Sequence, residues 1–222
     1  MVDIDAAIGF VVARGDVLDR ARLSHLRTGA IPGDEVYDQI ERGQTEVGGW
    51  PAKPGDPIPS VDATCFRLGE LDSLSGLGRP AARRALQWLV GRQRADGCWE
   101  EDPALAQSAP PWAVPGDPDA RFFLTASAAF WLCMADADCP EKDLGTRSPW
   151  ADAIDLAADA LREQITPTGG WPGFLASGWL AAAVLHRTGW FYEAARIFVA
   201  LSERVRTMAA ADAASLAATL RR

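Results

Sequence analysis

The sequence predicts an all-α protein built from repeated helical hairpins, and three observations support this fold class. Apolar residues recur at the three- and four-residue spacing of a helix face along most of the 222 residues. No segment of comparable length alternates apolar and polar residues as a half-buried strand would. A motif of glutamine, glycine and tryptophan occurs three times, each time between two apolar-periodic segments.

The first helical segment is expected over residues 3–27. Apolar residues share one face there: Ile4, Ile8, Val11 and Val12. The apolar stretch AAIGFVVA, residues 6–13, follows Asp3 and Asp5, whereas a secretory signal would carry positive charge before its apolar stretch. No apolar run approaches the length needed to cross a bilayer. We therefore expect a cytoplasmic protein without a membrane span.

Three hairpins are expected next, over residues 35–75, 80–136 and 150–188, followed by a last helical segment over 190–221. Each hairpin contains the repeated motif: QTEVGGW at 44–50, QRADGCW at 93–99, and QITPTGGW at 164–171 with one residue inserted before the glycine. Helical periodicity precedes and follows each motif. The repeating unit is therefore helix, Gly-Trp turn, helix.

The composition of the motif suits a tight turn between packed helices. A glycine after the last helical residue can adopt the left-handed conformation that ends a helix. An indole beside it can bury a large apolar area, so Trp50, Trp99 and Trp171 should lie at equivalent turns. The glutamine that begins each motif can hydrogen-bond the exposed backbone groups of the turn: Gln44, Gln93 and Gln164.

Composition and charge favour a single globular domain over residues 1–222. Hydrophobic residues make up 48% and charged residues 23% of the chain, which is ordinary for a globular protein. A formal charge of -8 argues against nucleic acid as a partner, because phosphate binding needs a basic face. The four cysteines form no CxxC pair and are expected to be reduced and mostly buried: Cys65, Cys98, Cys133 and Cys139.

The stretch RRALQWLVGRQRADGCWEED, residues 83–102, resembles the QW motif of the squalene-hopene cyclase and protein-prenyltransferase superfamily. The resemblance covers residues 35–205 at the level of hairpin repeats. It implies a terpenoid-cyclase-like α/α toroid with an apolar, aromatic-lined central cavity for an isoprenoid or similar small molecule. Toroids of that family have more than three hairpins, so this chain would form a smaller ring closed by its terminal helices, a partial ring, or half of a homodimer. The proline-rich residues 100–119 would form a lid or a structural strap.

The same resemblance makes Asp62 the candidate catalytic residue. Class II cyclases protonate their substrate with a DxDD motif, and SVDAT at 60–64 is similar, with Ser60 and Ala63 in place of the outer aspartates. Aligning the second helices of the hairpins places Asp62 level with Thr125 and Ala176. The residues expected to contact the substrate are Cys65, Phe66, Trp131 and Trp179.

The prenyltransferases suggest a different use of the same residue, because they hold zinc with Asp, Cys and His. Asp62, Cys65 and His186 are the available candidates, and the first two would share a helix face. Their spacing is one residue longer than the DxC pattern of that family, so no metal is predicted. No phosphate loop, dinucleotide fingerprint or DDxxD motif is present, and no cofactor is predicted.

A structural role for Asp62 competes with both kinds of chemistry. If Ser60 is the N-cap of the following helix, Asp62 falls in its first turn, where an ionised carboxylate interacts favourably with the helix dipole. An acid that is stabilised in its ionised form is a poor proton donor. The sequence therefore leaves open an isoprenoid cyclase or transferase, a non-catalytic binding module, and a dimeric scaffold that retains the repeats.

Overall fold

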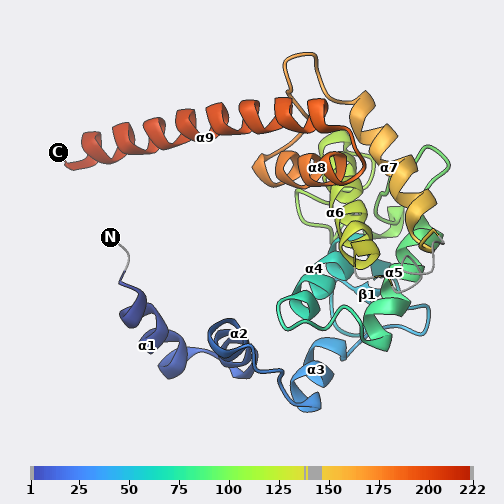
Figure 1. Ribbon diagram of the computed structural model, residues 1–222, viewed down its shortest axis with the longest axis vertical. Coiled ribbons are helices and arrows are strands. Elements are labelled where there is room, and N and C mark those ends of the chain that lie inside the picture. Colours follow the sequence, from blue (N-terminus) through green and yellow to red (C-terminus); the bar gives the residue numbers. More distant parts are fainter. Residues whose placement is uncertain (1–2, 138, 140–146, 221–222) are drawn as a thin grey trace. The chain divides into compact units, whose positions relative to one another are not determined.

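The computed structural model describes residues 3–137, 139 and 147–220, with 212–220 as backbone alone. These residues confirm the all-α prediction, because they form nine α-helices, one short 3-10 helix and a sheet of two short strands (Figure 1). The chain divides into two compact units, residues 1–88 and 89–222, whose boundary falls inside the helix α5. In the part of the chain that is described, no helix is both long and apolar enough to span a membrane.

The first unit begins with two helices where the sequence analysis expected one helical segment. Its elements are α1 (Ile4–Arg14), α2 (Val17–Thr28), α3 (Asp34–Glu41), β1 (Trp50–Pro51), β2 (Pro59–Ser60), α4 (Val61–Asp72) and the first turns of α5 (Pro80–Arg92). The segment is divided because Gly15 ends α1 and Asp16 begins α2. The Asp16 carboxylate accepts from the Asp19 N–H, and the Asp19 carboxylate accepts from the Asp16 N–H, which is a complete capping box.

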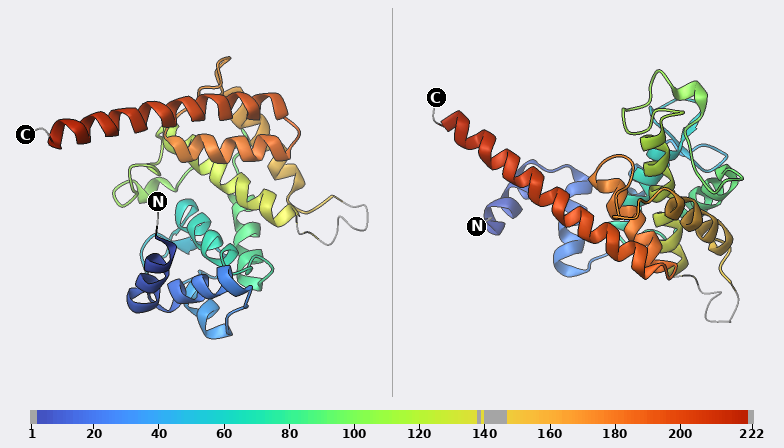
Figure 2. Two further views of the ribbon diagram at one scale, coloured as in Figure 1. Left: turned by 60° about the vertical axis from the view of Figure 1, so that its left-hand side comes forward. Right: turned by 90° about the horizontal axis from the view of Figure 1, so that it is seen from above.

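The second unit contains the end of α5 and the remaining helices. These are the 3-10 helix η1 (Pro103–Leu105) within the proline-rich excursion, α6 (Pro118–Ala137), α7 (Ala151–Glu163), α8 (Leu175–Arg187) and α9 (Phe191–Leu220). The α6 helix packs against α7 and α8, and α8 packs against α9. Figure 1 and the left view of Figure 2 show α9 lying along α8 and continuing beyond it.

The first Gly-Trp turn joins α3 to α4 and also contacts α5. The Gln44 side-chain amide donates to the Gly48 carbonyl at 2.7 Å and to the Ala81 carbonyl in α5 at 2.8 Å. Gly48 has a φ of +105°, and a Cβ there would lie 2.6 Å from the Arg84 carbonyl oxygen. Only glycine therefore fits between this turn and α5.

The second turn repeats this arrangement against α7. Gln93 donates to the Gly97 carbonyl at 3.1 Å and to the Ala153 carbonyl at 2.9 Å. A Cβ on Gly97 would lie 2.4 Å from the Leu156 carbonyl oxygen. The prediction that the glutamines bond backbone groups is thus confirmed for both turns, and each turn packs on the first helix of the next hairpin.

A hydrogen-bonded threonine connects each of these turns to its own second helix. The Trp50 N–H donates to the Thr64 hydroxyl at 2.9 Å, and the Trp99 N–H donates to the Thr125 hydroxyl at 3.1 Å. Each threonine hydroxyl in turn donates to the carbonyl four residues earlier in its helix. The indoles are fully buried, and that of Trp99 donates to the Leu89 carbonyl at 2.7 Å.

The third turn keeps the glycine contact but loses the threonine. A Cβ on Gly169 would lie 2.4 Å from the Arg196 carbonyl oxygen, so α9 meets this turn as α5 and α7 meet the first two. Gly178 lies against the Trp171 ring, where a Cβ would approach it to 2.2 Å. The Gln164 amide donates to Ala160 in its own helix instead of the following one. The equivalence of the three tryptophans is therefore close for two turns and partial for the third.

The bonded threonines correct the predicted alignment of the second helices. Thr64, not Asp62, is the counterpart of Thr125, and Asp62 is then level with Phe123. The error has a physical origin, because the threonine follows its tryptophan by 14 residues in the first hairpin and by 26 in the second. With loops so unequal, counting residues cannot fix the register.

Replacing Thr125 with valine should lower the free energy of unfolding by about 1–3 kcal/mol, because the buried Trp99 N–H then has no acceptor. Urea unfolding followed by circular dichroism measures this. Thr207→Val is the matched control, since Thr207 makes the same bond to the carbonyl four residues earlier on the exposed part of α9. Equal losses in the two variants would show that the bond to the tryptophan N–H contributes nothing.

Candidate functional site

The second unit contains an apolar pocket of about 460 Å³ where α6, α8 and α9 meet. The residues that line it are Phe130, Cys133, Met134, Ala137, Ala183, His186, Arg187 and Phe198. The four from α6 are spaced by three and four residues, so they form one face of that helix. The three from α8 have the same spacing, and α9 contributes Phe198. Helical periodicity alone thus brings these side chains to a common surface.

Additional aromatic rings support the rings that line this pocket. Trp131 packs edge-on against Phe130 with ring centroids 5.0 Å apart, and Trp179 packs edge-on against Phe198 at 5.8 Å. Such contacts add to the energy of apolar burial and fix the ring orientations. The two tryptophans predicted to contact a substrate therefore stand next to the lining residues. Trp179 is 55% exposed, and Trp131 is half-buried.

The polar groups of the pocket lie at the C-terminal end of α8. The His186 ring packs edge-on against Phe191 at a centroid distance of 5.1 Å. The Arg187 guanidinium pairs with Asp136 at 3.6 Å, and Asp136 accepts a hydrogen bond of 2.5 Å from the Ser148 hydroxyl. Arg187 also lines a neighbouring, more polar pocket of about 440 Å³. The apolar pocket therefore has a cationic boundary.

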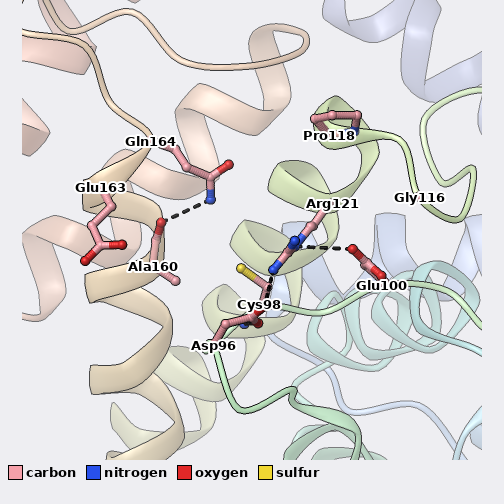
Figure 3. A pocket seen from close by; sticks show the side chains of 9 residues that line it. All are labelled: Asp96, Cys98, Glu100, Gly116, Pro118, Arg121, Ala160, Glu163 and Gln164. Atoms are coloured by element: carbon pink, nitrogen blue, oxygen red, sulfur yellow. Dashed lines mark hydrogen bonds and ion pairs between the residues drawn. The ribbon is translucent and has the colours of Figure 1, made fainter.

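A second, smaller pocket of about 270 Å³ is polar and centres on Arg121 (Figure 3). The guanidinium lies between Asp96 and Glu100, pairing with the first at hydrogen-bond distance and with the second at 3.3 Å. Arg94 pairs with the same glutamate at 3.2 Å. These bonds connect the second Gly-Trp turn to α6, so this cluster has a structural role.

The charges in this cluster stabilise one another. Burial alone would raise the pKa of Asp96, but the Cys98 N–H and the Arg121 guanidinium outweigh it and hold the pKa below its ordinary value. Burial would lower the pKa of Arg121, but its bonds to Asp96 and Cys98 raise it. Both groups are therefore ionised at neutral pH, and neither is suited to donate a proton.

Ser60 is confirmed as the N-cap of α4, since its hydroxyl accepts from the Ala63 N–H at 3.0 Å. Asp62 lies half-buried in the first turn of that helix. Cys65 is buried, whereas Phe66 is 65% exposed. These residues belong to the first unit, and the other predicted site residues, Trp131, Trp179 and His186, belong to the second. Their roles in substrate binding and catalysis remain predictions.

The proposed metal ligands are divided in the same way, with Asp62 and Cys65 in one unit and His186 in the other. Among the described residues, no group of three or more His, Cys, Asp or Glu side chains is arranged to hold a metal ion. All four cysteines are buried, as the sequence predicted.

Sequence reasoning predicted none of the eight lining residues as ligand contacts, and the large side chains among those that it missed are Phe130, Met134, Arg187 and Phe198. The helix-face spacing of Phe130, Cys133 and Met134 is visible in the sequence. The sequence does not indicate which helices pack against this face of α6, because the contributing segments of α6 and α9 lie more than sixty residues apart.

No protein family matches the chain, and neither does any curated protein. Among solved structures, a protein from Actinoplanes is 21% identical, with a TM-score of 0.46. The alignment covers 75% of this chain and 49% of that protein, so the chain spans about half of its length.

The ionised Asp96 should contribute to stability in a pH-dependent way. Because its pKa is lower in the folded protein than the ordinary 3.8, the contribution is complete above that pH and is lost as the pH falls through the lowered value. Asp96→Asn should therefore lower the free energy of unfolding at neutral pH, by less than about 1 kcal/mol because the group is partly exposed. The difference should vanish in acid.

Denaturant unfolding between neutral and strongly acidic pH measures this difference. Asp159→Asn is the control, because Asp159 pairs with Arg162 within one exposed helix face and joins no turn to a neighbouring helix. A difference between wild type and Asp96→Asn that persists at the acidic end would contradict the assignment.

Proposed function

We propose that the protein binds an apolar small molecule of the isoprenoid type in the pocket between α6, α8 and α9. The pocket itself is the observation that carries this proposal. Small-molecule sites typically enclose about 300–1,000 Å³ and are mostly apolar with a few polar groups, and the volume of about 460 Å³ and the lining described above fit that description.

The chemistry of the lining suits a branched, unsaturated chain. Phe130 and Phe198 present rings whose orientation is set by Trp131 and Trp179. Met134 adds an unbranched, polarizable side chain that adapts to irregular shapes. These features favour a flexible apolar ligand over a rigid polar one.

The expected affinity is moderate. A micromolar dissociation constant corresponds to about 8 kcal/mol, and association costs at least about 4 kcal/mol. At about 25 cal/mol per Å², the ligand and protein must together bury on the order of 500 Å² of apolar surface. We expect micromolar binding for a ligand that buries this much apolar surface in the pocket.

A separate catalytic hypothesis concerns Asp62, which lies in the first unit. It would act as a proton donor, as the similarity of SVDAT to the cyclase motif suggests. Asp62 lies in the first turn of α4, just after the Ser60 cap, and an acidic residue is common there for structural reasons, which favours the non-catalytic alternative. Ligand binding is therefore the proposed function, and isoprenoid cyclisation or transfer is a separate hypothesis that the Asp62→Asn variant tests. The dimeric scaffold is the remaining alternative.

Filling the pocket should weaken ligand binding. Ala183→Phe places a ring among the lining residues, and we expect it to weaken binding of farnesol and geranylgeraniol by about tenfold or more, equivalent to about 1.4 kcal/mol. Tryptophan fluorescence titration measures the affinity. Ala176→Phe adds the same ring to an exposed position of the same helix and should bind as wild type does.

Melting temperatures of both variants establish that the fold is retained. If wild type binds neither alcohol, or if both phenylalanine variants bind as wild type does, the pocket is not the ligand site.

Asp62→Asn tests the catalytic hypothesis. Asparagine is tolerated near helix starts but has no transferable proton, so ligand binding should survive and the loss of stability should not exceed about 1 kcal/mol. Product analysis by mass spectrometry with farnesyl and geranylgeranyl compounds then compares the two proteins. Product formed by wild type and lost in the variant supports a proton donor, and equal product formation excludes it.

A further inference from the structure

We propose that the apolar pocket selects single-chain ligands that end in an anionic group, with Arg187 as the residue that binds this group. This inference rests on the proposed function and adds the chemical class of the ligand's polar end. Apolar and charged residues are distributed unequally around the pocket. Six of the eight lining residues are uncharged and largely apolar, and the cationic Arg187 and the adjacent His186 lie together in the last turn of α8.

The backbone carbonyls at this end of α8 are hydrogen-bonded, which weakens their repulsion of an anionic ligand. The C-terminal carbonyls of a helix ordinarily repel an anion. Here the Val184 carbonyl accepts from the Thr188 N–H at 3.0 Å, and the Leu185 carbonyl accepts from the Trp190 N–H at 2.8 Å. The Thr188 hydroxyl adds a bond of 3.0 Å to Val184. These bonds satisfy the carbonyls and reduce the repulsion.

Asp136 holds the Arg187 guanidinium in place while leaving it able to bind a ligand. The Asp136 side chain is 10% exposed and is itself fixed by the Ser148 hydroxyl. The ion pair of 3.6 Å uses the Nη2 atom of Arg187, and a guanidinium offers five N–H donors in a planar fork. The Arg187 side chain is 46% exposed and lines the pocket, so a ligand can reach it.

His186 supplies a second donor next to Arg187. Its contact with Phe191 restricts the ring, and it lines the pocket one residue before the guanidinium. A ligand whose apolar chain contacts Phe130, Met134 and Phe198 would therefore place its end group between an imidazole N–H and a guanidinium. Carboxylates and phosphates are the groups that such donors bind best. The eight described residues that line the pocket include no carboxylate. Asp136 lies outside this lining, and an anionic end group would share the Arg187 guanidinium with it.

The test compares ligands that share one chain and differ in the end group. Dodecanoate, dodecyl phosphate, dodecanol and dodecyltrimethylammonium are titrated by calorimetry below their micelle concentrations. We expect at least one of the two anions to bind about tenfold tighter than dodecanol, equivalent to about 1.4 kcal/mol, and the ammonium compound to bind more weakly than the alcohol. The order of the two anions distinguishes a carboxylate from a phosphate ligand.

Arg187→Gln should remove the preference for the anion while leaving the affinity for dodecanol unchanged. Arg206→Gln is the matched control, since it removes a positive charge from the exposed part of α9 and should keep the preference. Arg187→Lys retains the charge without the planar fork and should give an intermediate preference. In wild type, added salt should weaken binding of the anions and spare dodecanol, which gives a readout that needs no variant.

Equal affinities of wild type for the anions and dodecanol would overturn this inference and leave the proposed apolar function standing. A preference that survives in Arg187→Gln would also overturn it. Failure of all four compounds to bind would overturn the proposed function as well.

Discussion

The hydrogen bond from a turn tryptophan N–H to a threonine hydroxyl in the following helix is the constraint on which the first two hairpins depend. It occurs at Trp50 and Trp99 and fixes how each second helix meets its turn. The same turns hold the next hairpin through their glycine and glutamine, because Gly48 and Gly97 lie directly against helix carbonyls. One short motif therefore sets both the geometry within a hairpin and the contact between successive hairpins.

The third turn uses a weaker version of this arrangement, and the candidate site lies beside it. Gly178 replaces the threonine and lets the Trp171 ring lie on α8, while Gly169 positions α9 through the Arg196 carbonyl. Placing α9 along α8 brings Phe198 to the face that α6 and α8 share, and this completes the apolar pocket. The site thus depends on how α9 continues the repeat. The third motif contributes by positioning α9, and none of its residues lines the pocket.

The sequence could predict the helices and turns because their signals are local. Helical periodicity, the Gln-Gly-Trp spacing and the Ser60 cap each involve residues within a few positions of one another. The register of the second helices could not be predicted, since the bond from Trp99 to Thr125 crosses a loop that has no equal in the first hairpin. The pocket could not be predicted for a similar reason, because Phe130 and Phe198 are brought together only by the packing of three helices. The prediction that Asp62 is catalytic rests on the resemblance of SVDAT to the DxDD motif, and the structure places this residue at the start of a helix.

The most direct test of the central claim, that α6, α8 and α9 form a ligand site, uses the methionines. The chain has three, of which Met134 lines the pocket and Met208 lies on α9 ten residues beyond Phe198, about 15 Å along the helix. Methyl-labelled protein titrated with farnesol should show a saturable shift of the Met134 resonance while that of Met208 stays in place. Movement of Met208 without Met134, or no change in either at saturating ligand, would contradict the account.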